Sequence, residues 1–103
     1  MTLVQTDELQ LALVVLPGWS VAGDVLQKEF KFKTFAAAIA FINRVAEVAR
    51  LARHHPEIWN SYNRVRLTLT THDEGGISDK DVAFARSVEG LEPSPVATMA
   101  RLS

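Results

Sequence analysis

The segment Phe35–Arg53 constrains the fold most, because it carries the longest helical pattern of the chain. Its apolar residues recur at alternating steps of three and four positions, which places them along one face of an amphipathic helix. Thr34 is suited to cap the N-terminus, and the helix must end near His54, because His55 precedes a proline and is pushed out of the helical region. The apolar stripe is wide enough to cover a sheet and leave surface for a partner. Its members are Phe35, Ala38, Ile42, Val45, Ala49 and Ala52.

Two pairs of strands are predicted to flank this helix in the sequence. Trp19–Ala22 and Val25–Phe32 are expected to form a hairpin, since apolar and polar residues alternate in the second segment. Ile58–Asn63 and Arg64–His72 are expected to form another pair, because the same alternation recurs in the second of them. In this pattern His72 leaves the sheet on its polar side.

Two further segments are predicted to be helical. Leu9–Leu16 follows two acidic residues that suit a helix N-terminus, although a run this short could equally be a strand. Ser78–Asp81 resembles a capping box and starts a final helix, which runs to about Glu89 and stops at Gly90. The order helix, strand, strand, helix, strand, strand, helix predicts an α+β fold: a four-stranded antiparallel sheet with three helices packed on one face.

Length and composition predict one cytoplasmic domain. The 103 residues, of which 48% are hydrophobic, are expected to form a single domain, 1–103, with a core at about 7–91 and a flexible tail at 92–103. The net charge of −1 gives no electrostatic reason to expect nucleic acid or a membrane as a partner. The chain has no cysteine, which fits a reducing cytoplasm. It has no apolar run of the roughly 20 residues that span a bilayer, and its first residues lack a signal-peptide pattern.

All three histidines lie in or just after one stretch, His54–Asn63, which begins with two adjacent imidazoles, His54 and His55. Each of them, and His72, could have a structural role, for example at a helix end. A zinc site is a second interpretation, but adjacent residues rarely point at one ion and no carboxylate stands at a usual ligand spacing. The third interpretation is general acid–base catalysis by imidazoles, whose charge changes near neutral pH.

The neighbours of the histidine pair have the residue types of a small-molecule pocket. Trp59 and Tyr62 offer aromatic walls, and Asn60 and Asn63 offer amide donors and acceptors. Taken alone, each aromatic side chain is better explained by packing in the core or at an interface. The chain contains no nucleophile elbow, P-loop or dinucleotide fingerprint, so covalent catalysis and nucleotide chemistry lack support.

A series of short motifs occurs in a specific order along the chain. They are Leu16-Pro17-Gly18-Trp19, Lys28-Glu29-Phe30-Lys31-Phe32, Phe41 to Val45, His54-His55-Pro56-Glu57, Ser61-Tyr62-Asn63-Arg64-Val65, Thr70-Thr71-His72-Asp73, and Gly76-Ile77-Ser78 with Asp81. This series resembles the pterin-4a-carbinolamine dehydratases, also called dimerization cofactors of a homeodomain transcription factor. The resemblance covers about Asp7 to Leu91, and the His-His-Pro element with a later Thr-His is its most specific part.

The resemblance implies a specific reaction. The family dehydrates 4a-hydroxytetrahydrobiopterin, which aromatic amino acid hydroxylases leave behind, and so yields quinonoid dihydropterin for tetrahydrobiopterin recycling. It uses no metal and no bound cofactor. One imidazole would protonate the departing 4a-hydroxyl while another accepts a proton from the ring nitrogen, and the sequence does not assign these two roles.

The site residues and partners follow from the resemblance and from the pocket-like composition. The expected catalytic residues are His54, His55 and His72. The expected partners are the pterin substrate, further copies of the chain in a homodimer or homotetramer, and a pterin-dependent aromatic amino acid hydroxylase. The residues expected to bind the substrate are Glu57, Trp59, Asn60, Tyr62, Asp73 and Asp81.

Two arginines depart from the family pattern. Arg50 stands four residues before the first histidine, where an acidic residue is common, and Arg53 stands directly before it, where an acidic or small residue is common. A guanidinium in the site would disfavour protonated histidines; alternatively, both arginines are solvated at a helix C-terminus. The departure leaves open a second class of function, that of a non-catalytic scaffold such as an assembly factor for carboxysomal RuBisCO. Such relatives tend to lose the histidine set, which this chain retains.

Overall fold

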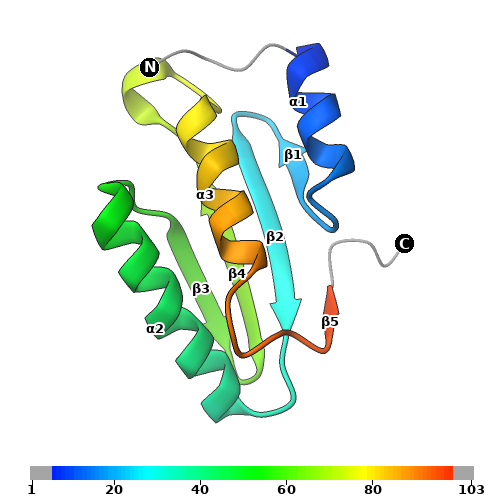
Figure 1. Cartoon of the computed structure of the whole chain (residues 1–103), viewed down its shortest axis with the longest axis vertical. Helices are drawn as coiled ribbons and strands as arrows, with labels where there is room; N and C mark the ends of the chain where they lie inside the picture. The colour runs from blue at the N-terminus through cyan, green and yellow to red at the C-terminus, as the bar shows by residue number, and fades with distance from the viewer. Residues whose placement is uncertain (1–5, 99–103) are drawn as a thin grey trace.

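The computed structural model describes residues 6–98 as a sheet covered by helices (Figure 1). The elements follow the predicted order, with a 3₁₀ turn (η1) and a short fifth strand in addition. No helix of residues 6–98 is long and apolar enough to cross a membrane. The bounds are α1 Thr6–Val14, β1 Ser20–Ala22, β2 Val25–Lys31, α2 Phe35–Ala52, β3 Glu57–Ser61, β4 Arg64–Leu69, η1 His72–Glu74, α3 Asp79–Glu89 and β5 Ala97–Thr98.

The sheet is antiparallel, and its strands stand in the order β1–β2–β4–β3. At the two ends of the central pair, Leu26 of β2 lies opposite Leu69 of β4, and Lys31 lies opposite Arg64. The three α-helices lie on one side of this sheet (Figure 1). The predicted α+β fold, a four-stranded antiparallel sheet with three helices packed on one face, is therefore confirmed.

Alternation along β2 and β4 decides which face the helices cover, because successive side chains of a strand point to opposite faces. The ring of Phe41 on α2 packs against two phenylalanine rings of the sheet layer. Its centroid is 4.9 Å from that of Phe30 and 4.8 Å from that of Phe32. From α3, Phe84 and Val88 complete the core. The buried residues of the two strands are Leu26, Lys28, Phe30, Val65, Leu67 and Leu69.

The helix ends follow the predicted capping signals. The Thr34 hydroxyl accepts a hydrogen bond from the Ala37 N–H at 3.0 Å, which confirms the N-cap of α2. Ser78 and Asp81 form the capping box that begins α3. α1 is a helix rather than a strand, but it begins at Thr6, earlier than expected, because its acidic residues lie within the first turn and interact favourably with the helix dipole.

The predicted strand Arg64–His72 is too long. β4 ends at Leu69, and His72 begins the 3₁₀ turn instead of continuing the sheet. The cause is the Thr71 carbonyl, which accepts hydrogen bonds from the N–H groups of Glu74 and Gly75, both at 3.0 Å. These bonds curl the chain, so His72 is placed by a turn and not by strand alternation.

The segment expected to be a flexible tail contains a strand. Ala97–Thr98 form β5, which pairs with Phe30 and Lys31 of β2. β1 pairs with the first part of β2, up to Gln27, so β5 continues the same edge of the sheet where β1 stops. The last five residues of the predicted tail, 99–103, lie outside the described residues.

A buried ion pair joins β2 to the end of α3. The Lys28 ammonium, on the core face as its place in the alternation predicts, is 2.7 Å from Glu89 Oε2, with side chains 3% and 25% exposed. The Trp19 indole N–H donates to the same oxygen at 2.8 Å. Glu89 therefore satisfies two buried donors at once.

We predict that Glu89→Ala lowers the free energy of unfolding by about 3 kcal/mol, because it leaves a buried ammonium without its partner. Urea denaturation measures this change. Glu47→Ala, at a carboxylate on α2 that is 56% exposed and paired with the exposed Arg50, serves as the control and is expected to change the midpoint little, because exposed ion pairs contribute little. A double change to Lys28→Met and Glu89→Leu should recover part of the loss, since no uncompensated charge remains, while the Trp19 indole N–H still lacks its acceptor. Equal midpoints for Glu89→Ala and Glu47→Ala would contradict the assigned role.

Candidate active site

The end of α2 places His54 against α3. Arg53, the first residue after the helix, has a left-handed backbone with φ of 53°. Its N–H and that of His54 both donate to the Ala49 carbonyl, the latter at 3.2 Å, in the pattern of a Schellman-type helix end. The chain therefore turns sharply, and the His54 ring packs edge-on against Phe84 with 6.1 Å between centroids.

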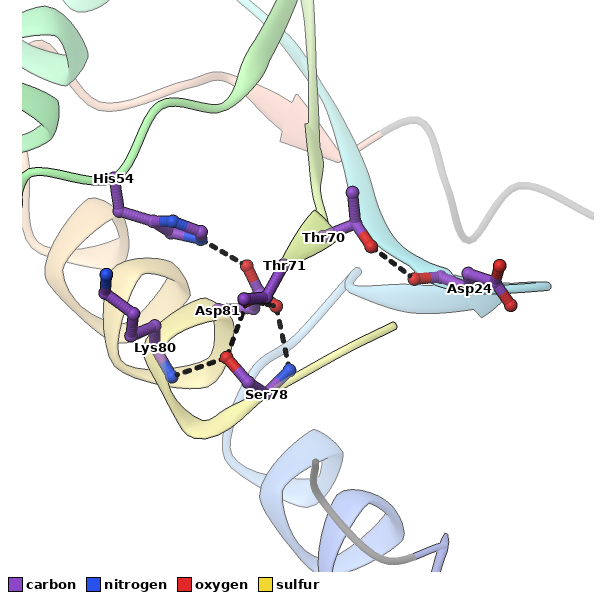
Figure 2. Close-up of polar contacts among 7 residues, drawn as sticks. All are labelled: Asp24, His54, Thr70, Thr71, Ser78, Lys80 and Asp81. Carbon is purple, nitrogen blue, oxygen red and sulfur yellow. Dashed lines mark hydrogen bonds and ion pairs between the residues drawn. The ribbon is translucent and has the colours of Figure 1, made fainter. Parts of the chain in front are cut away.

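Asp81 is a buried carboxylate in contact with His54. Its side chain is 0% exposed, and Oδ2 accepts hydrogen bonds from the Ser78 N–H at 2.8 Å and the Thr71 hydroxyl at 2.9 Å. Its Oδ1 contacts Nε2 of His54 (Figure 2). When Asp81 is ionised it can only accept hydrogen bonds, so Nε2 of His54 is then the donor of this contact and Nδ1 is the ring nitrogen outside it.

Two threonines that follow β4 tie this end of the strand to other parts of the fold (Figure 2). The Thr71 hydroxyl lies 2.6 Å from the Ser78 hydroxyl, and the backbone N–H of Thr71 donates to the Gly76 carbonyl at 2.8 Å. The Thr70 hydroxyl donates to the Asp24 carbonyl, in the turn between β1 and β2, at 2.9 Å. The end of β4 is thus fixed to α3 on one side and to the first hairpin on the other.

The three histidines line one cavity of about 330 Å³. A second cavity of about 370 Å³ shares His55, Thr70 and His72 with the first, so these three residues lie between the two. The first cavity is lined by Arg53, His54, His55, Thr70, Thr71, His72, Asp73 and Lys80. The second is lined by Val25, His55, Pro56, Glu57, Thr68, Thr70 and His72.

The residues expected to bind substrate divide into three groups. Asp73 lines the first cavity and Glu57 the second, so each adds a carboxylate near the histidines. Asp81 lines neither cavity, because it is fully buried and is occupied by His54, Ser78 and Thr71. Its contact with the site runs through the His54 ring.

Trp59, Asn60 and Tyr62 also line neither cavity, and β3 carries them away from the histidines. A strand advances about 3.3 Å per residue, so Tyr62 stands roughly 16 Å beyond the start of β3. Trp59 lies on the sheet face that the helices leave open, with the guanidinium groups of Arg66 and Arg64 at 4.5 Å and 5.5 Å from its ring centroid.

Asn60 and Tyr62 build the turn between β3 and β4. The Asn60 amide donates to the carbonyls of Tyr62 at 3.1 Å and Arg64 at 2.9 Å. Tyr62 has a left-handed backbone with φ of 52°, is 68% exposed, and stacks on Phe35 with 6.5 Å between centroids. The geometry of this one chain therefore gives neither residue contact with the histidine cavity.

The two unexpected arginines lie in different surroundings. Arg50 is exposed on α2 and donates a hydrogen bond to Glu47, a contact that lowers the pKa of the Glu47 carboxyl and raises the pKa of Arg50. Arg53 lines the cavity with the three histidines. The left-handed turn at Arg53 separates the two, because it takes Arg53 off the helix that carries Arg50.

In the first cavity, three lining residues were not predicted as site residues from the sequence: Thr70, Thr71 and Lys80. Lys80 lies inside the predicted capping box Ser78–Asp81. That motif was the one feature of the sequence that could have indicated that the start of α3 contributes to the site. In residues 6–98, no group of three or more histidine, aspartate or glutamate side chains is arranged to hold a metal ion.

The family of the chain follows from comparison with known proteins. The family model described as pterin 4 alpha carbinolamine dehydratase matches residues 2–91. A protein of Thermomicrobium roseum, provisionally named as a pterin-4-alpha-carbinolamine dehydratase, is 47% identical over 91 residues, which are 86% of this chain and 98% of the relative. A protein of Acidobacterium capsulatum with the same provisional name is 49% identical over 76 residues, 74% of this chain and 83% of the relative. The chain belongs to the pterin-4a-carbinolamine dehydratase family.

Two solved structures are similar to this fold. A transcriptional coactivator/pterin dehydratase from Brucella melitensis has a TM-score of 0.81 and 39% identity, over 85% of this chain and 96% of that one. A pterin dehydratase-like protein, described as a RuBisCO assembly factor in the alpha-carboxysome, has a TM-score of 0.60 and 27% identity, over 74% of this chain and 88% of that one. One of the two similar structures is therefore of a dehydratase-like protein that is described as an assembly factor.

We predict that Asp81→Asn lowers the free energy of unfolding by about 1–3 kcal/mol. The asparagine amide would place an NH₂ donor against groups that are themselves donors, so one of these buried hydrogen bonds would be lost. Asp79→Asn is the matched control, because Asp79 is exposed and lies in the same first turn of α3, so this substitution removes the same charge without touching a buried contact. Urea denaturation gives the free energy of unfolding of both variants, and their difference separates the contribution of the buried contacts of Asp81 from the effect of charge at the helix N-terminus. Equal losses in the two variants would show that the buried contacts of Asp81 add nothing.

Proposed function

We propose that the chain is a 4a-hydroxytetrahydrobiopterin dehydratase, a hydro-lyase of tetrahydrobiopterin recycling. The observation that supports this most is the convergence of His54, His55 and His72 on one cavity, with one ring fixed by a buried carboxylate. An imidazole oriented by a carboxylate is a common arrangement in acid–base catalysis. Membership of the family supplies the reaction that such a site would perform.

The proposed reaction needs one acid and one base. The substrate loses the 4a-hydroxyl from C4a and the proton from N5, the C4a–N5 double bond forms, and water leaves. His54 is the proposed base: Nε2–H is committed to Asp81, so Nδ1 accepts the N5 proton. His55 or His72, which lie between the two cavities, donates the proton that turns the hydroxyl into water. Glu57 and Asp73 are the carboxylates proposed to hold the pterin.

The proposal extends to location and assembly. We place the reaction in the cytoplasm, where a pterin-dependent aromatic amino acid hydroxylase would supply the substrate. A homodimer or homotetramer is supported by apolar side chains that α2 leaves at the surface, Phe35 at 48% exposure and Leu51 at 69%. These side chains would gain from burial against another copy of the chain.

A second candidate function is that of a non-catalytic scaffold. The similarity to a relative described as a RuBisCO assembly factor favours it. The intact set of three histidines around a cavity favours the enzyme. The two functions differ in whether the histidines are needed, so turnover by histidine variants distinguishes them.

We predict that the protein accelerates the decay of enzymatically generated 4a-hydroxytetrahydrobiopterin in a stopped-flow absorbance assay. His54→Ala and His72→Ala are each expected to lower kcat by about 10²–10⁴-fold, the usual contribution of a general acid or base. Arg44→Ala, at an exposed position of α2, is the control and should retain the wild-type rate. Circular dichroism must show that each variant is folded. If the folded wild-type protein gives no acceleration, the proposed dehydratase activity is wrong and the scaffold function remains.

A further inference from the structure

The hydroxyl groups of Thr71 and Ser78 are buried beside Asp81 and have no part in the proposed reaction. The Thr71 hydroxyl donates to Oδ2 of Asp81 at 2.9 Å, and its oxygen lies 2.6 Å from the Ser78 hydroxyl oxygen. Ser78 is 0% exposed and Thr71 is 8% exposed. Because a buried donor without an acceptor is destabilising, each of these hydroxyls must give its proton to a definite partner.

The number of protons decides the direction of these hydrogen bonds. A hydroxyl carries one proton and accepts at its lone pairs. Since the Thr71 proton goes to Asp81, the Thr71 oxygen is the acceptor in the contact with Ser78, and the Ser78 hydroxyl is the donor. The Ser78 oxygen in turn accepts the backbone N–H of Lys80 at 3.2 Å. The bonds therefore run one way, from the start of α3 through Ser78 and Thr71 to Asp81 (Figure 2).

This arrangement leaves no place for a proton on Oδ2 of Asp81. That oxygen accepts from the Thr71 hydroxyl at 2.9 Å and from the Ser78 N–H at 2.8 Å, so a proton on it would point at two donors. The proton between Asp81 and His54 therefore lies in the contact of Oδ1 with Nε2. Because two hydrogen bonds to a carboxylate favour its charged form, this proton belongs to Nε2 of His54.

Thr71 also places a second histidine. Its carbonyl accepts the N–H groups of Glu74 and Gly75, both at 3.0 Å, and these bonds form the turn that begins with His72. The same residue thus places His72 through its backbone and His54 through its side chain and Asp81. A substitution that changes only the side chain separates the two effects, because the backbone bonds to the turn remain.

We propose that the hydroxyls of Thr71 and Ser78 are positioning groups, which hold the charge and orientation of Asp81 and so keep the proton on Nε2 of His54. The consequence for turnover rests on the proposed function. In that reaction Nδ1 of His54 accepts the N5 proton, and a charged, fixed Asp81 stabilises the imidazolium that forms. The placement of the proton on His54 does not depend on any reaction, so it can be tested by itself.

Nuclear magnetic resonance of the protein with ¹⁵N-labelled histidine tests the placement of the proton. Long-range ¹H–¹⁵N spectra resolve the ring nitrogens, and His54→Ala assigns those of His54 by the loss of their signals. In the wild type we expect a proton on Nε2 that resonates downfield and exchanges slowly with water, since it is donated to a buried carboxylate. Thr71→Val keeps the shape of the side chain without the hydroxyl and should move this signal upfield and speed its exchange. Thr71→Ser keeps the hydroxyl and should leave the signal in place.

Thr70→Val is the matched control for the loss of a hydroxyl. The Thr70 hydroxyl donates to the Asp24 carbonyl at 2.9 Å, so its removal should leave the His54 signal at the wild-type position. The double variant Thr71→Val with Ser78→Ala removes both hydroxyls, so no buried donor is left without an acceptor. It should still show the shifted signal. If it restores the wild-type signal, the unpaired Ser78 hydroxyl caused the change and the positioning role is wrong. Circular dichroism confirms that each variant is folded.

Stopped-flow turnover connects the position of the proton to the reaction. Thr71→Val should lower kcat about tenfold, which corresponds to the loss of one hydrogen bond to a charged group. Its KM should change little, because the hydroxyl acts on Asp81 and not on the substrate. Thr71→Ser should retain most of the wild-type kcat.

The outcomes separate this inference from the proposed function. If Nε2 of His54 carries no proton in the wild type, or if Thr71→Val leaves its signal unchanged, the positioning role is overturned even when the protein dehydrates the pterin. If the signal responds as expected but the folded wild type has no dehydratase activity, the proposed function is overturned and the positioning of His54 stands.

Discussion

The buried carboxylate of Asp81 is the constraint on which the rest of the site depends. A charge that is fully removed from water is stable only while donors surround it, and its donors come from three separate segments: Ser78 at the start of α3, Thr71 after β4, and His54 after α2. The same contacts that begin α3 therefore also orient the His54 ring. Because one group serves both purposes, the geometry of the cavity cannot loosen without weakening the fold, and the sheet and the helices support the site directly.

Local patterns in the sequence were sufficient for the architecture. The caps at Thr34 and Ser78 depend on residues within one turn, and the strand faces depend on simple alternation, so both could be predicted. The site was harder to predict because its contacts are long-range. Asp81 meets His54 across 27 positions, and His72 is placed by hydrogen bonds to the Thr71 carbonyl that interrupt the strand pattern. Proximity in sequence suggested Trp59 as a wall of the pocket, but an extended strand separates neighbours quickly in space.

The two arginines illustrate how a family pattern and a backbone conformation must be considered together. Arg50 and Arg53 are close in sequence, yet only Arg53 reaches the cavity, because the chain leaves the helix between them. The departure from the family pattern at Arg50 is a surface change paired with Glu47. The departure at Arg53 changes the charge of the cavity itself and so bears on what the cavity binds. A comparison of residue types alone would have given the two positions equal weight.

The short strand β5 has a consequence for the growth of the sheet. One border of the sheet is made of two fragments, β1 with three residues and β5 with two, while the other border is the continuous five-residue strand β3, with Ile58 exposed. Short, interrupted borders are poor templates for an incoming strand, whereas a continuous one is a good template. Strand addition is therefore directional: two molecules joined through β3 would present only fragmented borders to the solution. Such a sheet ends after one partner and does not extend into a fibre.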